Sequence, residues 1–149
     1  MVLMLQLPMP FISTFAIDTH ELTVTSADEI MGTVTGSGTY DYNSSVTIKA
    51  TPKTGYHFVK WDDDDTNASR SVTITGDAAY MATFEANSYD ITVLSVDEST
   101  GTVSGSGSYK YATTQTISAT PVEHYHFQKW NDGNTENPRS ITIAGTATY

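Results

Sequence analysis

The sequence predicts an all-β protein made of tandem small β-sheet modules with little or no helix. Three observations support this: the chain repeats itself at a constant offset, Thr, Ser, Tyr, Val, Ile and Gly dominate its composition, and its apolar residues alternate with period two. β-branched and aromatic residues favour pleated strands, and alternation places them on one face of a sheet. No window of about 11 residues shows the period of an amphipathic helix. We expect at most a single helical turn, near residues 27–31.

An internal repeat divides the chain. Residues 32–40 (GTVTGSGTY) recur as residues 101–109 (GTVSGSGSY), an offset of 69 positions, and no gap is needed between Leu22 and Tyr149. A fixed offset over so long a stretch is the signature of tandem modules. We therefore assign the first whole repeat to residues 18–87 and the second to residues 88–149, in which the counterpart of the last strand is missing.

Residues 1–17 precede these two copies. They are apolar, but they lack the basic start of a secretory signal peptide, and Pro8 and Pro10 interrupt the segment. Shifted by the same offset, residues 11–15 lie over residues 80–84. We interpret residues 1–17 as the last two strands of a truncated preceding repeat.

Five or six short strands are expected in each copy. In the first copy, alternation predicts strands at 22–25, 46–51, 56–61, 72–75 and 80–84. Turn-forming residues separate them, including the glycine-rich stretch 36–38 and the aspartate-rich stretch 62–67. In the third strand, Tyr56 and Phe58 are expected on one face and Trp61 on the other.

Aromatic residues must supply much of the core, because a module of about 69 residues buries only around 60% of its unfolded surface. The candidates in the first copy are Tyr40, Tyr56, Phe58, Trp61, Tyr80 and Phe84. The second copy has a counterpart for each except Phe84. We therefore expect residues 88–149 to form the weaker module.

Charge and composition exclude several functions. The net charge of −10, from 17 acidic and 7 basic side chains, repels nucleic acid and anionic membranes. The absence of cysteine excludes disulfides, thiolate metal sites and a cysteine nucleophile. The glycine-rich stretch leads into neither a helix nor a lysine, so it does not match a phosphate-binding loop, and no nucleophile elbow is present. We expect no enzyme, no cofactor and no direct membrane insertion.

The aspartate-rich turn is the most conspicuous candidate site. Oxygen-rich loops bind Ca²⁺, which makes Asp62, Asp63, Asp64 and Asp65, with Asp132 in the second copy, weak metal-site candidates. The alternative is a solvated hairpin turn neutralised by Lys60 and Arg70. His124 and His126 would share one face of a strand, as two metal ligands or as a surface pair.

Four aromatic residues are weak ligand-binding candidates. Trp61 and Trp130 could stack on sugar rings, or they could cover the core, since they end equivalent apolar strands. Tyr42 and Tyr111 are similarly ambiguous.

The ordered motifs carry a family resemblance. In the first copy they are Gly32, the stretch 36–40, Ala50 to Pro52, Gly55 to Trp61 and Met81 to Phe84; in the second they are Gly101, 105–109, 119–121 and 125–130 with Asp132-Gly133. This combination resembles the bacterial repeats related to the B-repeat of internalin B, known as Listeria–Bacteroides repeats, and especially their divergent members. His124 and Asp64 depart from the pattern, because each replaces a glycine.

The resemblance implies extracellular modules of bacterial cell-surface or secreted proteins, β-grasp-like in fold, that act without catalysis as stalks, spacers or adhesive surfaces in cell adhesion. The alternatives are a glycan-binding accessory module and, more remotely, a weak Ca²⁺-binding repeat. The expected partners are neighbouring repeats of the array and a host or cell-surface protein or glycan. Strand-swapped self-association is also expected, with residues 11–16 of one molecule filling the edge that another leaves open after Tyr149.

Overall fold

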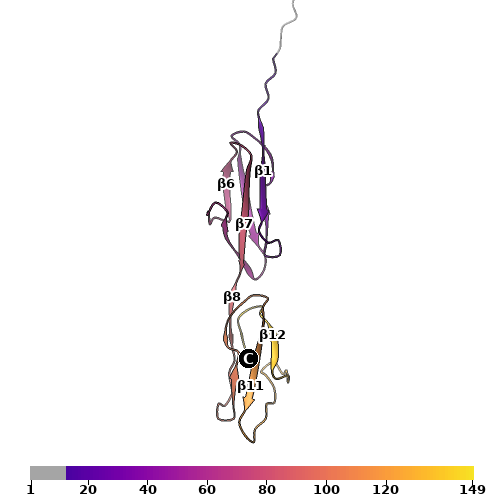
Figure 1. Cartoon of the computed structure of the whole chain (residues 1–149), viewed down its shortest axis with the longest axis vertical. Helices are drawn as coiled ribbons and strands as arrows, with labels where there is room; N and C mark the ends of the chain where they lie inside the picture. The colour runs from indigo at the N-terminus through magenta and orange to yellow at the C-terminus, as the bar shows by residue number, and fades with distance from the viewer. Residues whose placement is uncertain (1–12) are drawn as a thin grey trace, which may run out of the picture.

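The computed structural model describes residues 13–149, which form two β modules arranged end to end (Figure 1). Residues 1–12, which hold most of the expected strands of a preceding repeat, lie outside the described part. Residues 13–18 form no strand, and Phe15 is 95% exposed. Residues 13–16, the described part of the strand expected over residues 11–16, pair with no other strand. No helix among the described residues is long and apolar enough to cross a membrane.

The first module contains two sheets. One has the strand order β3-β1-β7-β5 and the other β2-β4-β6. All pairings are antiparallel except that of β1 with β7, which is parallel. The strands are β1 (Thr19–Ser26), β2 (Gly32–Thr35), β3 (Gly38–Asp41), β4 (Ser45–Pro52), β5 (Tyr56–Trp61), β6 (Ser69–Thr73) and β7 (Ala78–Ala86).

The core of the first module lies between these sheets, because buried side chains come from both. Leu22 and Val24 alternate inward along β1, while Val46, Ile48 and Ala50 do so along β4. Trp61, Ile74, Ala82 and Phe84 complete the buried set. The period-two pattern of the sequence is therefore the pattern of burial. Residues 13–149 contain no helix, so the module is two packed sheets rather than a β-grasp, in which a helix covers a sheet.

The second module repeats this plan with fewer strands. Its sheets have the orders β10-β8-β13 and β12-β11-β9. Its separate core consists of Ile91, Val93, Ile117, Trp130, Ile141 and Ile143. The strands are β8 (Ser88–Thr92), β9 (Gly101–Ser104), β10 (Gly107–Lys110), β11 (Thr114–Pro121), β12 (Arg139–Thr142) and β13 (Ala147–Thr148).

The glycine-rich stretch is more ordered than the expected turn. It forms two short strands, β2 and β3, around Gly36 and Ser37. The pairing of β1 with β3 ends at Leu22 and Gly38. At Val24 the Ser37 side chain takes the place of a partner strand, because its Oγ accepts the Val24 N–H at 2.8 Å and donates to the Val24 carbonyl at 3.1 Å. Residues 28–31 form a turn rather than a helical segment, closed by the Met31 N–H to the Asp28 carbonyl.

The expected facing of Trp61 was wrong. A β-bulge between Phe58 and Lys60 shifts the register of β5 against β7. An extra residue in a strand reverses the faces that follow it. Trp61 therefore points into the core beside Phe58, with ring centroids 5.5 Å apart.

Candidate functional site

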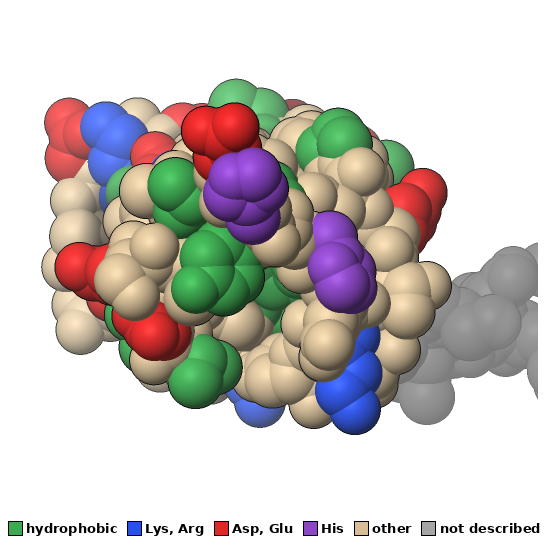
Figure 2. Space-filling view, turned by 90° about the horizontal axis from the view of Figure 1, so that it is seen from below, with side chains coloured by type: hydrophobic (Ala, Val, Ile, Leu, Met, Phe, Trp, Pro, Cys, Tyr) green, Lys and Arg blue, Asp and Glu red, His purple; other side chains and the backbone are tan. Residues whose placement is uncertain are grey.

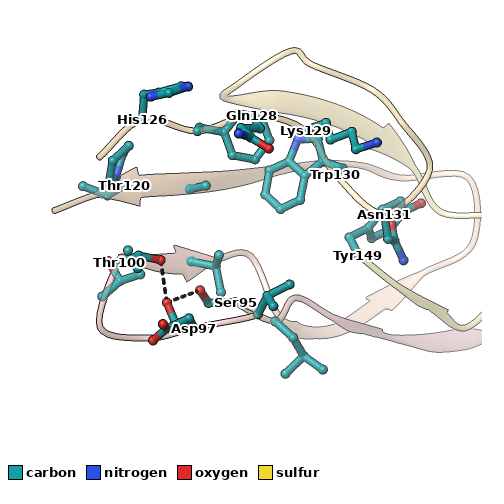
Figure 3. A pocket seen from close by; sticks show the side chains of 18 of the residues that line it. Ser95, Asp97, Thr100, Thr120, His126, Gln128, Lys129, Trp130, Asn131 and Tyr149 are labelled. Carbon is teal, nitrogen blue, oxygen red and sulfur yellow. Dashed lines mark hydrogen bonds between the residues drawn. The ribbon is translucent and has the colours of Figure 1, made fainter. Parts of the chain in front are cut away.

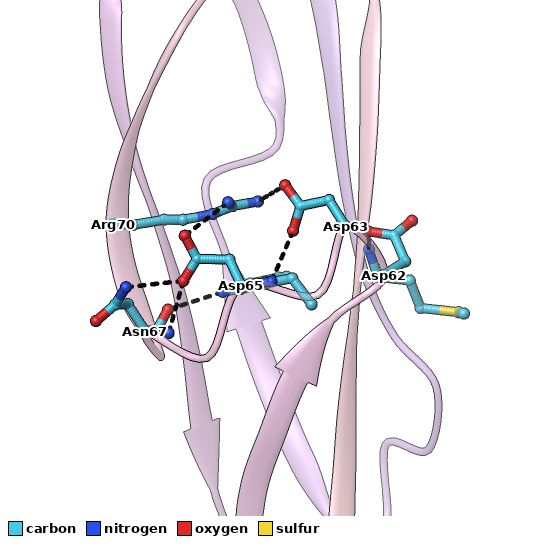
Figure 4. A network of polar contacts seen from close by, with 7 residues as sticks. Asp62, Asp63, Asp65, Asn67 and Arg70 are labelled. Atoms are coloured by element: carbon cyan, nitrogen blue, oxygen red, sulfur yellow. Dashed lines mark hydrogen bonds and ion pairs between the residues drawn. The ribbon is translucent and has the colours of Figure 1, made fainter.

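The aspartate-rich turn follows β5 and is held by bonds within the first module (Figure 4). Arg70, from β6, reaches both Asp63 and Asp65, and its Nη1 lies 3.0 Å from Asp65 Oδ2. Asp65 Oδ1 also accepts the backbone N–H of Asn67 at 2.7 Å. That backbone bond, followed by the Asn67 and Arg70 side-chain contacts, lowers the pKa of the Asp65 carboxyl.

The remaining two aspartates of this turn also have partners. Lys60 Nζ lies 2.6 Å from Asp64 Oδ1, and this contact lowers the pKa of Asp64 and raises the pKa of Lys60. Asp62 Oδ1 accepts the Met81 N–H at 3.1 Å, which ties the turn to β7. Within residues 13–149, no group of three His, Cys, Asp or Glu side chains is placed to hold a metal ion. The carboxylates of this turn are engaged in stabilising it.

The second module has the same arrangement with fewer charges. Arg139 Nη1 lies 2.7 Å from Asp132 Oδ2, and Asp132 Oδ1 accepts the Asn134 N–H. The Asn134 bond, and then Arg139, lowers the pKa of Asp132. Each arginine also covers a tyrosine ring, Arg70 over Tyr80 at 4.8 Å and Arg139 over Tyr149 at 5.2 Å. The repeated feature is thus an arginine that lies between an acidic turn and a tyrosine ring, Tyr80 in the first module and its counterpart Tyr149 in the second.

The two tryptophans lie in the cores. Trp61 is 0% and Trp130 4% exposed, and each indole N–H donates at 2.9 Å to a backbone carbonyl, of Asn67 and Glu136 respectively. A sugar-stacking platform needs an open ring face, so the structure does not support that role for either residue.

The histidine pair lacks the strand geometry that would align it. Residues 125–130, the counterpart of β5, form no strand, and His124 has a positive φ of 70°. His124 is exposed and lies 3.7 Å from Glu123. The expectation that both rings share a strand face was wrong. In the first module β5 pairs with Ala82 to Ala86 of β7, whereas in the second module no strand pairs with residues 125–130.

A groove of about 760 Å³ opens at the far end of the second module, between the loop Leu94–Asp97 and residues 126–131 (Figure 3). Trp130 and Tyr149 line its inner part. Seen from that end, hydrophobic side chains gather in the middle of the face, with histidine and acidic side chains around them (Figure 2). Leu94 and Val96 are among the exposed hydrophobic residues there.

The first module shows what this groove corresponds to. Ser95, Val96 and Trp130 of the groove correspond to Ser26, Ala27 and Trp61 of the first module. There these residues contact the second half of β7, because Ser26 and Trp61 pair with Ala82 and the Ala27 N–H donates to the Ala82 carbonyl. Phe84 lies directly over Gly32, the counterpart of Gly101. The groove therefore lies at the position that the second half of β7 fills in the first module.

The two tyrosine candidates occupy equivalent places but differ in surroundings. Tyr42 is 45% exposed and packs edge-on to His20. Tyr111 instead lies between the two modules, with its ring 5.3 Å from Tyr56 of the first module. Sequence reasoning missed this junction. The signal available was that both copies have the tyrosine, whereas the opposing residue changes from Gly55 to His124.

Comparison with known proteins adds the family assignment. A family model described as the divergent InlB B-repeat domain matches residues 22–88 and again residues 91–148. No curated protein and no solved structure shows significant similarity to the chain. The two matched ranges coincide with the two modules of the structure.

Proposed function

The chain belongs to the divergent InlB B-repeat domain family, with two tandem copies, and we propose that it is a non-enzymatic spacer of a bacterial cell-surface or secreted protein. In this role the modules hold another part of the parent protein away from the cell envelope. The occurrence of the family in bacterial surface and secreted proteins supports an extracellular location, and its typical lack of catalysis supports a structural role.

The short connection between the modules is the observation that carries this proposal. Strand β7 ends at Ala86 and β8 begins at Ser88, so a single residue, Asn87, joins them. A long flexible linker would let the modules collapse on one another, whereas one residue bonded on both sides limits their motion. The modules therefore extend along one axis (Figure 1).

The length of the strands gives the reach of such a spacer. At about 3.3 Å per residue, the nine residues of β7 span roughly 30 Å, so each module adds about that much. The alternative of glycan binding has less support, because both tryptophans are buried.

Small-angle X-ray scattering tests the spacer role. The full chain is compared with a chain in which a second copy of residues 18–86 is inserted between Ala86 and Asn87. We expect the maximum dimension to grow by roughly 30 Å, while the cross-sectional radius of gyration stays unchanged. A larger cross-section without added length would show that the modules fold back, and would contradict the spacer function.

A further inference from the structure

The junction between the modules is built around Asn87, whose backbone is bonded to both sides. Its N–H donates to the Gly55 carbonyl at 2.8 Å, and its carbonyl accepts the Tyr111 N–H at 2.8 Å. Lys110 Nζ adds a bond to the Ala86 carbonyl at 3.0 Å. These contacts fix the backbone at the junction, but they need the two module ends to approach closely.

Close approach depends on the absence of a side chain at Gly55. The Tyr111 ring lies directly against this glycine, and a Cβ there would overlap the ring atoms. Gly55 also has a φ of 86°, a conformation that glycine adopts without strain. The Tyr111 ring is then flanked by Tyr56 at 5.3 Å and Tyr89 at 6.3 Å, both edge-on. Such aromatic pairs add to the stabilisation that burial alone gives.

Half of the same junction recurs at the outer end of the first module. The Tyr42 N–H donates to the Asp18 carbonyl at 2.8 Å, as the Tyr111 N–H does to Asn87. His20 packs edge-on to Tyr42 at 6.0 Å, in the place that Tyr89 takes beside Tyr111. Among the described residues no module end covers this half, and Tyr42 is half exposed.

The far end of the second module presents the other half in altered form. Tyr125 is the counterpart of Tyr56 and is 58% exposed. His124 replaces Gly55 and keeps the positive φ, at 70°. The turn geometry is therefore retained, but a side chain stands where the first module leaves room for a tyrosine ring.

We propose that the residue directly before Tyr56, and its counterpart before Tyr125, decides whether a module can dock the module that follows it. A glycine, as at Gly55, accepts the tyrosine of the following module, and a side chain, as at His124, prevents that docking. The Tyr42 end is accordingly a docking surface for one kind of partner, another module of this fold that carries glycine at the position of Gly55. This selectivity concerns module docking and holds whether or not the array is a spacer.

The test on the full chain uses Gly55→His and Tyr111→Ala, which remove the contact from opposite sides. Residual dipolar couplings of backbone amides report whether both modules share one alignment tensor. We expect a shared tensor in the parent chain and two different tensors in each variant. Exchange of the backbone amide at position 111 is expected to be at least about tenfold faster in both variants than in the parent chain, because the local opening free energy falls.

Matched controls come from the uncovered positions. His124→Gly and Tyr42→Ala change the equivalent residues where no module is seated, so both chains should retain the shared tensor. The second module already has histidine in this turn, so we expect Gly55→His to fold. If that variant nevertheless unfolds the first module, Tyr111→Ala alone tests whether the contact holds the two modules together. A single shared tensor in Tyr111→Ala would overturn the proposal.

A gain-of-docking experiment tests the selectivity directly. Continuing the full chain after Tyr149 with a second copy of residues 81–149 gives three modules, and the new junction, between the second and third modules, opposes His124 to a tyrosine. We expect the third module to tumble with its own alignment tensor in this chain and to adopt the tensor of its neighbour when His124→Gly is introduced. Identical behaviour of the two chains would contradict the assigned role of this residue.

Discussion

At the residue scale, four adjacent aspartates in one turn repel one another, and the structure relieves this through Arg70, Lys60 and backbone N–H groups. The lowered pKa of Asp65 means that the folded state holds its proton less tightly than the unfolded state. The resulting stability is present above the unfolded pKa of about 3.9 and is lost as pH falls through the folded pKa.

Acid titration of thermal unfolding checks this effect. We expect the melting temperature of the first module to fall as pH is lowered below about 4, and Asp65→Asn to flatten that dependence. Asparagine retains an oxygen for the Asn67 N–H, so the turn itself is preserved. Asp132→Asn is the matched change in the second module, whose own acid dependence it should flatten. An unchanged acid slope in Asp65→Asn would refute the assignment.

Trp61 provides the second prediction at this scale. Phenylalanine in its place keeps an aromatic ring but leaves the Asn67 carbonyl without its indole partner and a void in the core. We expect Trp61→Phe to lower the free energy of unfolding by about 2–3 kcal/mol. Urea denaturation measures this, with Tyr42→Ala as an exposed control expected to change stability by less than about 0.5 kcal/mol. Equal costs for the two variants would show that Trp61 is not a core residue.

At the scale of strands, the groove of the second module can be tested as a strand slot. In the first module the matching strand buries Ala82 and Phe84. A peptide with the sequence of residues 80–87 should therefore bind beside Trp130 and raise the unfolding temperature of the second module. At a peptide concentration of 100 times its dissociation constant, the gain would be about 2.7 kcal/mol. The control peptide has alanine at the position of Phe84, and equal stabilisation by both peptides would contradict a specific slot.

The same groove is where a donated strand would enter if two molecules exchange segments. The expected donor is residues 11–16, of which residues 11 and 12 lie outside the described part of the chain. Phe15, which aligns with Phe84, is exposed in the single chain and would become buried by exchange. Analytical ultracentrifugation should then reveal association that rises with concentration and that Phe15→Ser weakens. A monomer at every concentration would exclude strand exchange.

Regular strands could be predicted from the sequence, whereas a strand bulge and a contact between modules could not. The strand expected at 46–51 corresponds to β4, Ser45–Pro52, because its period of two is unbroken and directly gives its buried face. In β5 the bulge follows from pairing with β7, a contact distant in sequence, so alternation alone misplaced Trp61. The role of Gly55 likewise depends on Tyr111 in the next module. Local patterns reveal which residues alternate, whereas sites made by two distant segments require the fold.

At the scale of the whole molecule, the two modules have separate cores of unequal size. Nine residues are buried in the first core and six in the second, and the second lacks a strand at residues 125–130. Buried apolar area is the main source of stability in small domains. The second module should therefore be the weaker one and should gain support from the junction.

Hydrogen exchange in increasing urea tests this inequality, because it reports each module separately. We expect amides of β11 to lose protection at a lower urea concentration than those of β4, their counterpart in the first module. Tyr111→Ala should lower the urea midpoint of β11 further and leave that of β4 nearly unchanged, since the less stable partner depends more on the shared contact. Equal protection of the two strands would contradict the inequality. A simultaneous fall of both midpoints in the variant would instead show that the modules unfold as one cooperative unit, in which the junction belongs to a common core.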